Sequence, residues 1–199
     1  MRDEYLRILQ TPAVARVQRA AYGRAGSVSG ASSLPRALGV EERAYIEARD
    51  SFYMASLSES GWPYLQHRGG PAGFLKVIDE RRLAFLDQEG NRQLISAGNV
   101  ATDDRVSLFL MDYRARERLK LLCRARCVEL ADEPEVASLF SDAERLRARR
   151  LFVLEVVGFD WNCPKFITQR FTRAEVEEAL GALRSRIEEL ETELEGRGE

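Results

Sequence analysis

The clearest structural signal in the chain is the stretch RLKLLCRARC, which occupies residues 118–127. Apolar or small side chains fall at every second position from Leu119 to Cys127, and basic side chains fill the alternate positions, with Leu122 as the exception. This period of two predicts a β-strand with one buried face and one polar face. Cys123 and Cys127 lie on the buried face, where we interpret them as small apolar core residues rather than a reactive or metal-binding pair.

Short apolar runs on both sides of this stretch predict further strands. They lie at residues 52–57, 64–68, 74–78, 82–86, 106–111 and 151–157. Turn residues separate the first four runs at close spacing, so we expect an antiparallel meander there. The last run is apolar on both faces apart from Glu155, which is typical of a central strand. Six or seven short strands with few helices predict a small barrel that is closed or nearly closed.

Apolar spacings of three or four predict helices elsewhere in the chain. They lie at residues 1–22, 41–49, 91–103, 133–140 and 141–149, and from residue 173 onward. Ser141 with Glu144, and Thr172 with Glu175, have the spacing of capping boxes. A Gly- and Ser-rich stretch at 23–39 is typical of a linker. We therefore expect three parts, which are an N-terminal helical extension with its linker (1–49), the barrel (50–170) and a C-terminal helix (171–199).

The C-terminal helix carries a regular apolar seam. Its members are Val176, Leu180, Leu183, Ile187, Leu190 and Leu194. Their alternating steps of four and three are the period of a coiled coil. Two interpretations stay open, which are a helix packed on its own barrel and a helix paired with its copy in a dimer.

Composition limits the class of protein. The chain has 199 residues, 45 % of them hydrophobic and 31 % charged, with a net charge of −2. This balance is that of a globular protein and excludes a disordered chain, and the near-neutral charge argues against a nucleic-acid or membrane partner. The first residues show no signal peptide and no apolar run is long enough to span a membrane, so we expect a cytoplasmic protein.

The scarcity of some residue types excludes several chemistries. There is one histidine, His67, and the three cysteines contain no Cys-x-x-Cys pair. We therefore expect no zinc site and no Ser-His-Asp system. No phosphate-binding Walker loop is present, and the glycines at 69–73 lack the spacing of a dinucleotide-binding motif.

Cationic residues mark a candidate anion site. Lys76 interrupts an apolar strand, Arg92 stands at the expected start of the helix 91–103, and basic side chains line one face of 118–127. A helix N-terminus with a nearby arginine binds anions well, and phosphate is the natural occupant. Each of these cations taken alone is also typical of a solvated surface charge.

Several segments in this order resemble one known family. They are HRGGPAGFLKV (67–77), DQEGNR (87–92), Asn99 followed by VSLFL (106–110), and the basic strand 119–127. Over about residues 52–164 the chain resembles the FMN-binding split barrel of the pyridoxamine 5′-phosphate oxidase-like flavoproteins. The resemblance implies a mostly β fold, an antiparallel split β-barrel with N-terminal helices and a long C-terminal helix. It also implies a homodimer with FMN at the interface.

The resemblance implies a set of cofactor-binding residues and no metal. Lys76 and Arg92 would hold the FMN phosphate, with Asn91 and Ser96 as neutral donors. The flavin ring would be bordered by His67, Arg68, Gly69, Gly70 and Phe74. Asp87 and Gln88 would lie at its polar edge, and Arg118 and Lys120 would reach it from the basic strand. Trp161 would either close over the partner's flavin or anchor the last helix.

One segment departs from the family pattern. True pyridoxamine phosphate oxidases end in a segment bearing Arg and His that grips the substrate phosphate, whereas this chain has DWNCPKFI (160–167) followed by a long helix. We therefore expect an FMN-dependent oxidoreductase that transfers hydride or electrons between a reductant and another small molecule. The alternative is a non-catalytic carrier of flavin or haem, and a deazaflavin in place of FMN also stays open. No side chain is an obvious general acid or base, and His67 is the sole imidazole.

Overall fold

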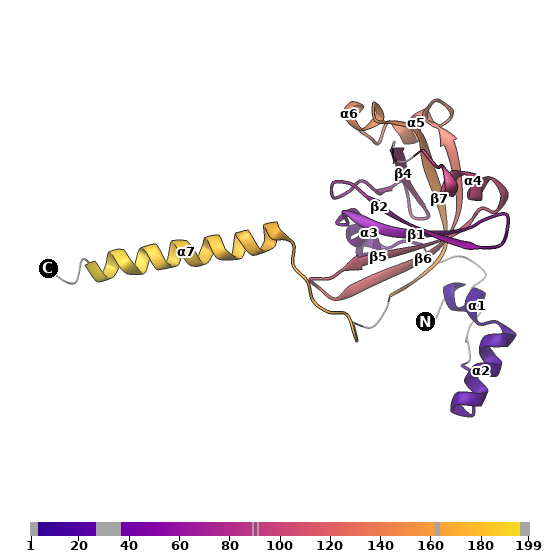
Figure 1. Cartoon of the computed structure of the whole chain (residues 1–199), viewed down its shortest axis with the longest axis horizontal. Helices are drawn as coiled ribbons and strands as arrows, with labels where there is room; N and C mark the ends of the chain where they lie inside the picture. The colour runs from indigo at the N-terminus through magenta and orange to yellow at the C-terminus, as the bar shows by residue number, and fades with distance from the viewer. Residues whose placement is uncertain (1–3, 27–36, 89, 91, 162–163, 196–199) are drawn as a thin grey trace. The chain divides into compact units, whose positions relative to one another are not determined.

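The computed structural model describes residues 4–26, 37–88, 90, 92–161 and 164–195. Internal contacts divide the chain into two compact units (Figure 1). The first comprises Met1–Met111 and Arg118–Cys163, and the second comprises Asp112–Glu117 and Pro164–Glu199. Most of the expected linker, and the predicted site residue Asn91, lie outside the described residues.

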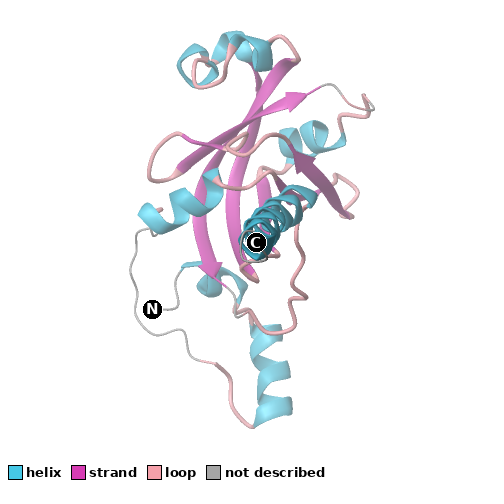
Figure 2. Cartoon of the chain, turned by 90° about the vertical axis from the view of Figure 1, so that its left-hand side faces the viewer, coloured by secondary structure: helices cyan, strands magenta, loops and turns pink. Residues whose placement is uncertain are grey.

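The first unit is built on one sheet of seven strands in the order β2-β1-β5-β6-β7-β4-β3. The strands are β1 (Ser51–Leu57), β2 (Pro63–Gly69), β3 (Lys76–Val77), β4 (Arg82–Gln88), β5 (Arg105–Asp112), β6 (Glu117–Glu129) and β7 (Ala148–Trp161). The pairings with a defined register are antiparallel, and the sheet curves without closing on itself (Figure 2). A mostly β, antiparallel split barrel is therefore confirmed.

The alternating stretch forms β6, as predicted. Leu119, Leu121, Cys123 and Ala125 are each at most 3 % exposed, and the side chains between them are half-buried or exposed. Burial raises the pKa of the Cys123 thiol. Burial, followed by the negative charge of a neighbouring aspartate, raises the pKa of the half-buried Cys127 thiol to about 11. At neutral pH both thiols are therefore protonated, as the core interpretation requires.

The prediction of a four-strand meander is wrong. β1 pairs with β2 and β3 pairs with β4, but β2 and β3 lie at opposite edges of the sheet. The short segment 70–75 joins them without pairing, and it places Phe74 and Leu75 in the core. Local turn signals detect each hairpin but not the longer-range pairings of β1 with β5 and of β4 with β7.

The strand β7 lies between β6 and β4, so the prediction of a central strand is confirmed. It is longer than expected, since it begins at Ala148 rather than at Leu151. The helix predicted at 141–149 is correspondingly short, and α6 covers only Asp142–Arg145. Its capping box is formed as predicted, with Ser141 and Glu144 bonded to each other.

The other helices also differ in extent from the predictions. They are α1 (Glu4–Leu9), α2 (Pro12–Tyr22), α3 (Val40–Glu47), α4 (Ile95–Thr102), α5 (Pro134–Ala137) and α7 (Arg173–Glu195), with a short 3₁₀ turn, η1 (Leu130–Asp132). The single helix expected at 1–22 is divided because Thr11 caps α2 and Pro12 opens it. The helix expected from residue 91 starts only at Ile95, because Arg92 and Leu94 have positive φ angles of 60° and 55°.

Helix α1 packs tightly on the sheet at one glycine. A Cβ added to Gly158 in β7 would lie 2.8 Å from the backbone nitrogen of Tyr5. The Lys120 ammonium lies 4.9 Å from the centre of the Tyr5 ring and 2.9 Å from Asp160. The absence of a side chain at Gly158 thus allows the helix to approach the strand.

The second unit consists of α7, the segment 164–172 that precedes it and the turn between β5 and β6 at 112–117. Thr172 and Glu175 cap the helix reciprocally, as predicted, and Arg114 pairs with Glu175 at 3.2 Å. The seam residues from Val176 to Leu190 are 41–61 % exposed, and the side chain of Leu194 lies outside those described. Among the helices that the structure describes, none has the length and apolar character needed to traverse a bilayer.

Candidate functional site

Several of the predicted site residues line one cavity of about 500 Å³ in the first unit. Its described walls come from β2, the end of β4, residues 90 and 92–94, the first turn of α4 and the start of β7. The described lining residues are Tyr64, Gln66, Arg68, Asp87, Gln88, Gly90, Arg92, Gln93, Leu94, Ile95, Ser96, Ala97, Arg149 and Arg150. We call this space the arginine cavity, because four arginines line it. Among the described lining residues the four arginines oppose one carboxylate, which leaves a net charge of +3.

Alternation along β2 explains three of these residues. Tyr64, Gln66 and Arg68 lie at every second position and are half-buried, while the residues between them are exposed. Side chains at alternate positions of a strand share one face. Strand β2 therefore presents a phenol, an amide and a guanidinium to the cavity.

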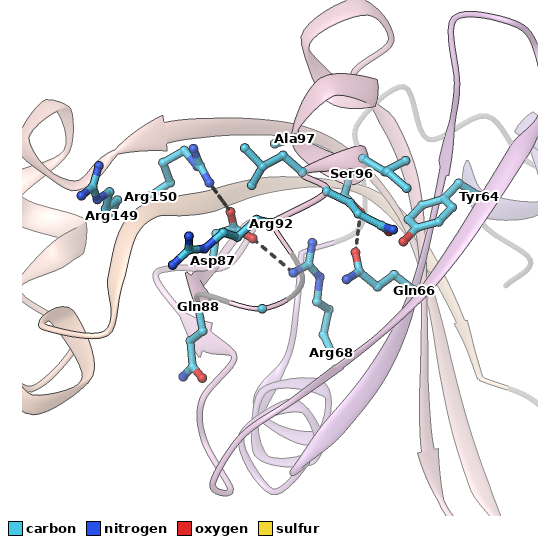
Figure 3. A pocket seen from close by; sticks show the side chains of 14 residues that line it. Tyr64, Gln66, Arg68, Asp87, Gln88, Arg92, Ser96, Ala97, Arg149 and Arg150 are labelled. Carbon is cyan, nitrogen blue, oxygen red and sulfur yellow. Dashed lines mark hydrogen bonds and ion pairs between the residues drawn. The ribbon is translucent and has the colours of Figure 1, made fainter.

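Asp87 connects two of the arginines (Figure 3). Its side chain is 9 % exposed, and Oδ1 accepts a hydrogen bond from Nη1 of Arg68 at 3.2 Å. Its Oδ2 accepts from Nη2 of Arg150 at 3.1 Å and from Nε at 3.3 Å. Asp87 and Arg150 are register partners on β4 and β7, so the pairing of the strands brings them together. The hydrogen bond to Asp87 raises the pKa of Arg150.

The guanidinium of Arg68 also lies over two aromatic rings. Its guanidinium carbon lies 5.4 Å from the centre of the Phe85 ring and 5.3 Å from that of Phe152. The two rings are stacked on each other at 4.9 Å. The buried Nε of Arg68 has no hydrogen-bond partner among the described residues. Cation–π contact and the Asp87 ion pair together fix the orientation of this guanidinium.

The first turn of α4 faces the same cavity. Its N-cap residue, Leu94, is in the left-handed conformation, and no side chain caps the helix. Ser96 is 1 % exposed and donates from Oγ to Oε1 of Gln66 at 2.9 Å (Figure 3). Asn99, one turn later, donates from Nδ2 to Oγ of Ser56 at 2.9 Å and so anchors α4 to β1. The first N–H groups of a helix have no partner within it, and an anion is well suited to accept their hydrogen bonds.

Five predicted residues, Arg68, Asp87, Gln88, Arg92 and Ser96, line the arginine cavity. Arg92 requires a correction of context, because it lies in the loop before α4 and not at the helix start. A smaller cavity of about 180 Å³ is lined by His67, Gly69 and Phe74, and it shares Arg68 and Gln88 with the larger one. Gly70 contacts Phe74, since a Cβ added to it would lie 2.8 Å from that side chain.

Five of the described predicted residues line neither cavity, which are Gly70, Lys76, Arg118, Lys120 and Trp161. The Lys76 ammonium lies 5.7 Å from the centre of the Phe140 ring, and Lys120 pairs with Asp160. The guanidinium of Arg118 lies 6.0 Å from the centre of the Phe109 ring. Trp161 donates from Nε1 to Oε1 of Glu42 at 2.9 Å, with its ring edge-to-face on Tyr45.

Tyr64, Gln66, Arg149 and Arg150 line the cavity but were not predicted. The helix predicted at 141–149 includes Arg149, whereas the structure places both arginines at the start of β7, where a register shift leaves Arg149 without a partner in β4 next to Arg150. The signal for Tyr64 and Gln66 is their spacing of two from Arg68 on one strand.

Comparison with known proteins relates this site to one family. Residues 39–160, more than half of the chain, match the profile of the pyridoxamine 5′-phosphate oxidase family. No curated protein matches the sequence significantly.

Solved structures share the fold at low sequence identity. HupZ from Group A Streptococcus has a TM-score of 0.52 at 10 % identity, with 67 % of this chain and 99 % of that one covered. A protein of Lactobacillus delbrueckii described as a putative pyridoxamine 5′-phosphate oxidase has a TM-score of 0.50 at 16 % identity, with 62 % and 93 % covered. HutZ from Vibrio cholerae, described as a heme storage protein, has a TM-score of 0.44 at 18 % identity, with 62 % and 94 % covered. Identities this low show a shared fold and no shared ligand, and the family itself follows from the profile over residues 39–160: the chain belongs to the pyridoxamine 5′-phosphate oxidase family.

Proposed function

We propose that the arginine cavity binds FMN and that the protein is an FMN-dependent oxidoreductase acting between a reductant and another small molecule. The observation that carries this proposal is the meeting of four arginines with an uncapped helix N-terminus in one cavity of a family barrel. Such a donor set suits a phosphate dianion, and a cavity of about 500 Å³ is in the range of cofactor sites.

The arginines divide into two pairs. Arg68 and Arg150 are held by Asp87, so their charge is partly compensated and their positions are fixed. Arg92 and Arg149 are exposed, and neither has an ion-pair partner among the described residues. We assign the phosphate to Arg92, Arg149 and the first turn of α4, where charge-assisted hydrogen bonds are available.

The flavin ring is assigned to the adjoining smaller cavity and its border. Its described lining includes His67, Gly69 and Phe74. Bound FMN supplies hydride- and electron-transfer chemistry, whereas the protein positions it and excludes competing reactions. We do not include Lys76 in the phosphate site, because it does not line the arginine cavity.

We also propose that a second copy of the chain completes the site. Leu65 on the edge strand β2 is 64 % exposed, and Leu94 and Ile95 at the rim of the cavity are 47 % and 36 % exposed. Apolar side chains grouped around a polar cavity are typical of an interface. A cytoplasmic location stays a prediction from the sequence.

The test of the phosphate site compares FMN with riboflavin, which lacks the phosphate. Titration of the full chain should give tighter binding of FMN, and Arg92→Ala with Arg149→Ala should weaken FMN binding about a hundredfold while leaving riboflavin binding unchanged. The magnitude follows from about 1.5 kcal/mol for each hydrogen bond to a charged group. Arg147→Ala is the matched control, because Arg147 is exposed and does not line the cavity. Equal losses in both variants would refute the assignment.

A carrier of flavin or haem without turnover is the second candidate. Among the described residues that line the two cavities, His67 is the one imidazole and none is a cysteine, so few side chains that transfer protons near neutral pH border the proposed flavin site. Anaerobic addition of NADH or NADPH separates the two proposals. Rapid bleaching of the bound flavin and recovery with an acceptor indicates an oxidoreductase, whereas an unchanged flavin spectrum indicates a carrier. A Soret band in the protein as isolated would indicate haem.

A further inference from the structure

The apolar seam of α7 is exposed, because no described part of the second unit packs over it. Val176, Leu180, Leu183, Ile187 and Leu190 are each 41–61 % exposed. They recur with the spacing of one helix face over most of a helix of 23 residues. Exposed apolar side chains arranged in such a row mark an interaction surface.

We propose that this seam pairs with the same seam of a second copy, as a parallel two-stranded coiled coil. The spacing places Leu183 and Leu190 at the d positions of the heptad and Ile187 at the a position between them. A β-branched residue at a with leucine at d favours two parallel strands. The central part of the seam therefore has the side chains that this arrangement requires.

The flanking charges select the parallel direction. Arg186 occupies a g position, and Glu191 occupies the e position of the next heptad. In a parallel pair these two positions face each other across the interface, so Arg186 lies opposite the partner's Glu191, and symmetry repeats the pair. The two attractive contacts also fix the register.

An antiparallel pair that overlaps the whole seam would bring like charges together. If Leu183 packed against the partner's Ile187, both Arg184 and Arg186 would face their own copies across the two-fold axis. Glu177 would then face the partner's Glu191. Facing like charges destabilise a coiled coil and act against this arrangement.

The charge of the helix also argues against a membrane as the occupant. Helix α7 contains three arginines and eight glutamates. Amphipathic helices that lie on membranes carry basic side chains on the polar face, and anionic lipids repel an acidic one. A second copy of α7 offers an apolar seam for this seam and opposite charges for Arg186 and Glu191 on its flanks.

Disulfide trapping in the full chain tests the pairing. Leu190→Cys places a thiol at a d position, where two copies in a parallel coiled coil come close enough to form a disulfide. Ser185→Cys is the matched control, because position 185 lies on the opposite face at f. In a glutathione redox buffer, Leu190→Cys should form a covalent dimer at least about tenfold faster than Ser185→Cys or the unsubstituted chain, because only the seam thiols are held together. Equal rates would overturn the proposal.

Mixing two variants tests the direction. When Leu180→Cys and Leu190→Cys chains are mixed, a parallel coil yields disulfides between like positions. An antiparallel coil yields the mixed disulfide between positions 180 and 190 and would overturn the proposal. This readout concerns α7 alone, so it does not depend on whether FMN binds.

Charge reversal tests the register. Added to the Leu190→Cys chain, Arg186→Glu should slow disulfide trapping roughly tenfold, since two attractive pairs become repulsive. Adding Glu191→Arg should restore the rate, whereas Arg184→Glu should have little effect because position 184 faces the partner's Ala179. A rate that is insensitive to Arg186→Glu, or no recovery when both charges are reversed, would overturn the charge pairing.

Discussion

Replacing Asp87 by alanine should destabilise the first unit strongly, because the carboxylate compensates two arginines in the wall of the cavity. The side chains of Arg68 and Arg150 are 13 % and 27 % exposed, and that of Asp87 is 9 % exposed. Removing one member of a buried ion pair leaves uncompensated charge and costs about 3–5 kcal/mol of unfolding free energy. The variant therefore has a large and measurable expected effect.

The geometry places the cost near the lower limit of that range. Arg150 is exposed enough to regain water when the carboxylate is lost. Arg68 keeps its contacts with the rings of Phe85 and Phe152. We expect a loss of about 3 kcal/mol, which lowers the melting temperature of a chain of this size by roughly 6–12 °C.

Thermal and urea unfolding, followed by circular dichroism, measure this effect. Asp104→Ala is the matched control, because Asp104 pairs with Arg124 at an exposed site, where an ion pair contributes less than about 1 kcal/mol. A double-mutant cycle of Asp87→Ala and Arg150→Ala should give a coupling free energy of at least about 1 kcal/mol. A melting temperature for Asp87→Ala equal to that of Asp104→Ala, or additive effects in the cycle, would refute the reasoning.

Three further predictions concern other parts of the first unit. Gly158→Ala places a methyl group against the backbone of Tyr5, so we expect α1 to detach and tryptic cleavage near the N-terminus to accelerate; an unchanged digestion pattern would contradict this. At pH 8 iodoacetamide should alkylate Cys127 about a hundredfold more slowly than a thiol with the ordinary pKa of 9.0, as peptide mass spectrometry can measure, because its pKa is raised to about 11. Hydrogen bonds from the Ser141 side chain and backbone lower the pKa of Glu144, so its charged form stabilises the fold above the ordinary value of 4.5, and this stabilisation is lost as the pH falls through the lowered pKa. The difference in urea midpoint between the natural chain and Glu144→Gln should therefore shrink from pH 7 to pH 3, and a constant difference would contradict the assignment.

Local sequence patterns predict the strands well and their pairing only in part. The alternation along 118–127 and the apolar run at 151–157 identify β6 and β7, because burial of one face or both is encoded residue by residue. The positions of β2 and β3 at opposite edges depend on which distant strands pair with β1 and β4. No periodicity within a single segment contains that information.

The residues of the candidate site also divide into those that can be predicted from the sequence and those that reach the site only through strand pairing. Arg92 is predicted from its own segment and Arg68 from the family resemblance, and both line the cavity. Arg150 reaches it only through the pairing of β7 with β4, which places it opposite Asp87. Lys76, which the resemblance places at the phosphate, does not line this cavity, and its ammonium lies 5.7 Å from the centre of the Phe140 ring.

A carboxylate in a cavity that is proposed to bind a phosphate requires a physical reason, and the repulsion among the arginines provides one. Four guanidinium groups lining about 500 Å³ repel one another, and Asp87 offsets one charge while holding Arg68 and Arg150 in place. The remaining charge of +3 exceeds that of a phosphate monoester, which carries about −1.5 to −2 at pH 7. Asp87 therefore lowers the cost of assembling the empty site without cancelling its attraction for a dianion. Arg92 and Arg149 are not ion-paired with described residues, so both would be available to a bound phosphate, and Asp87 with Arg68 and Arg150 would form a fixed wall of the proposed site.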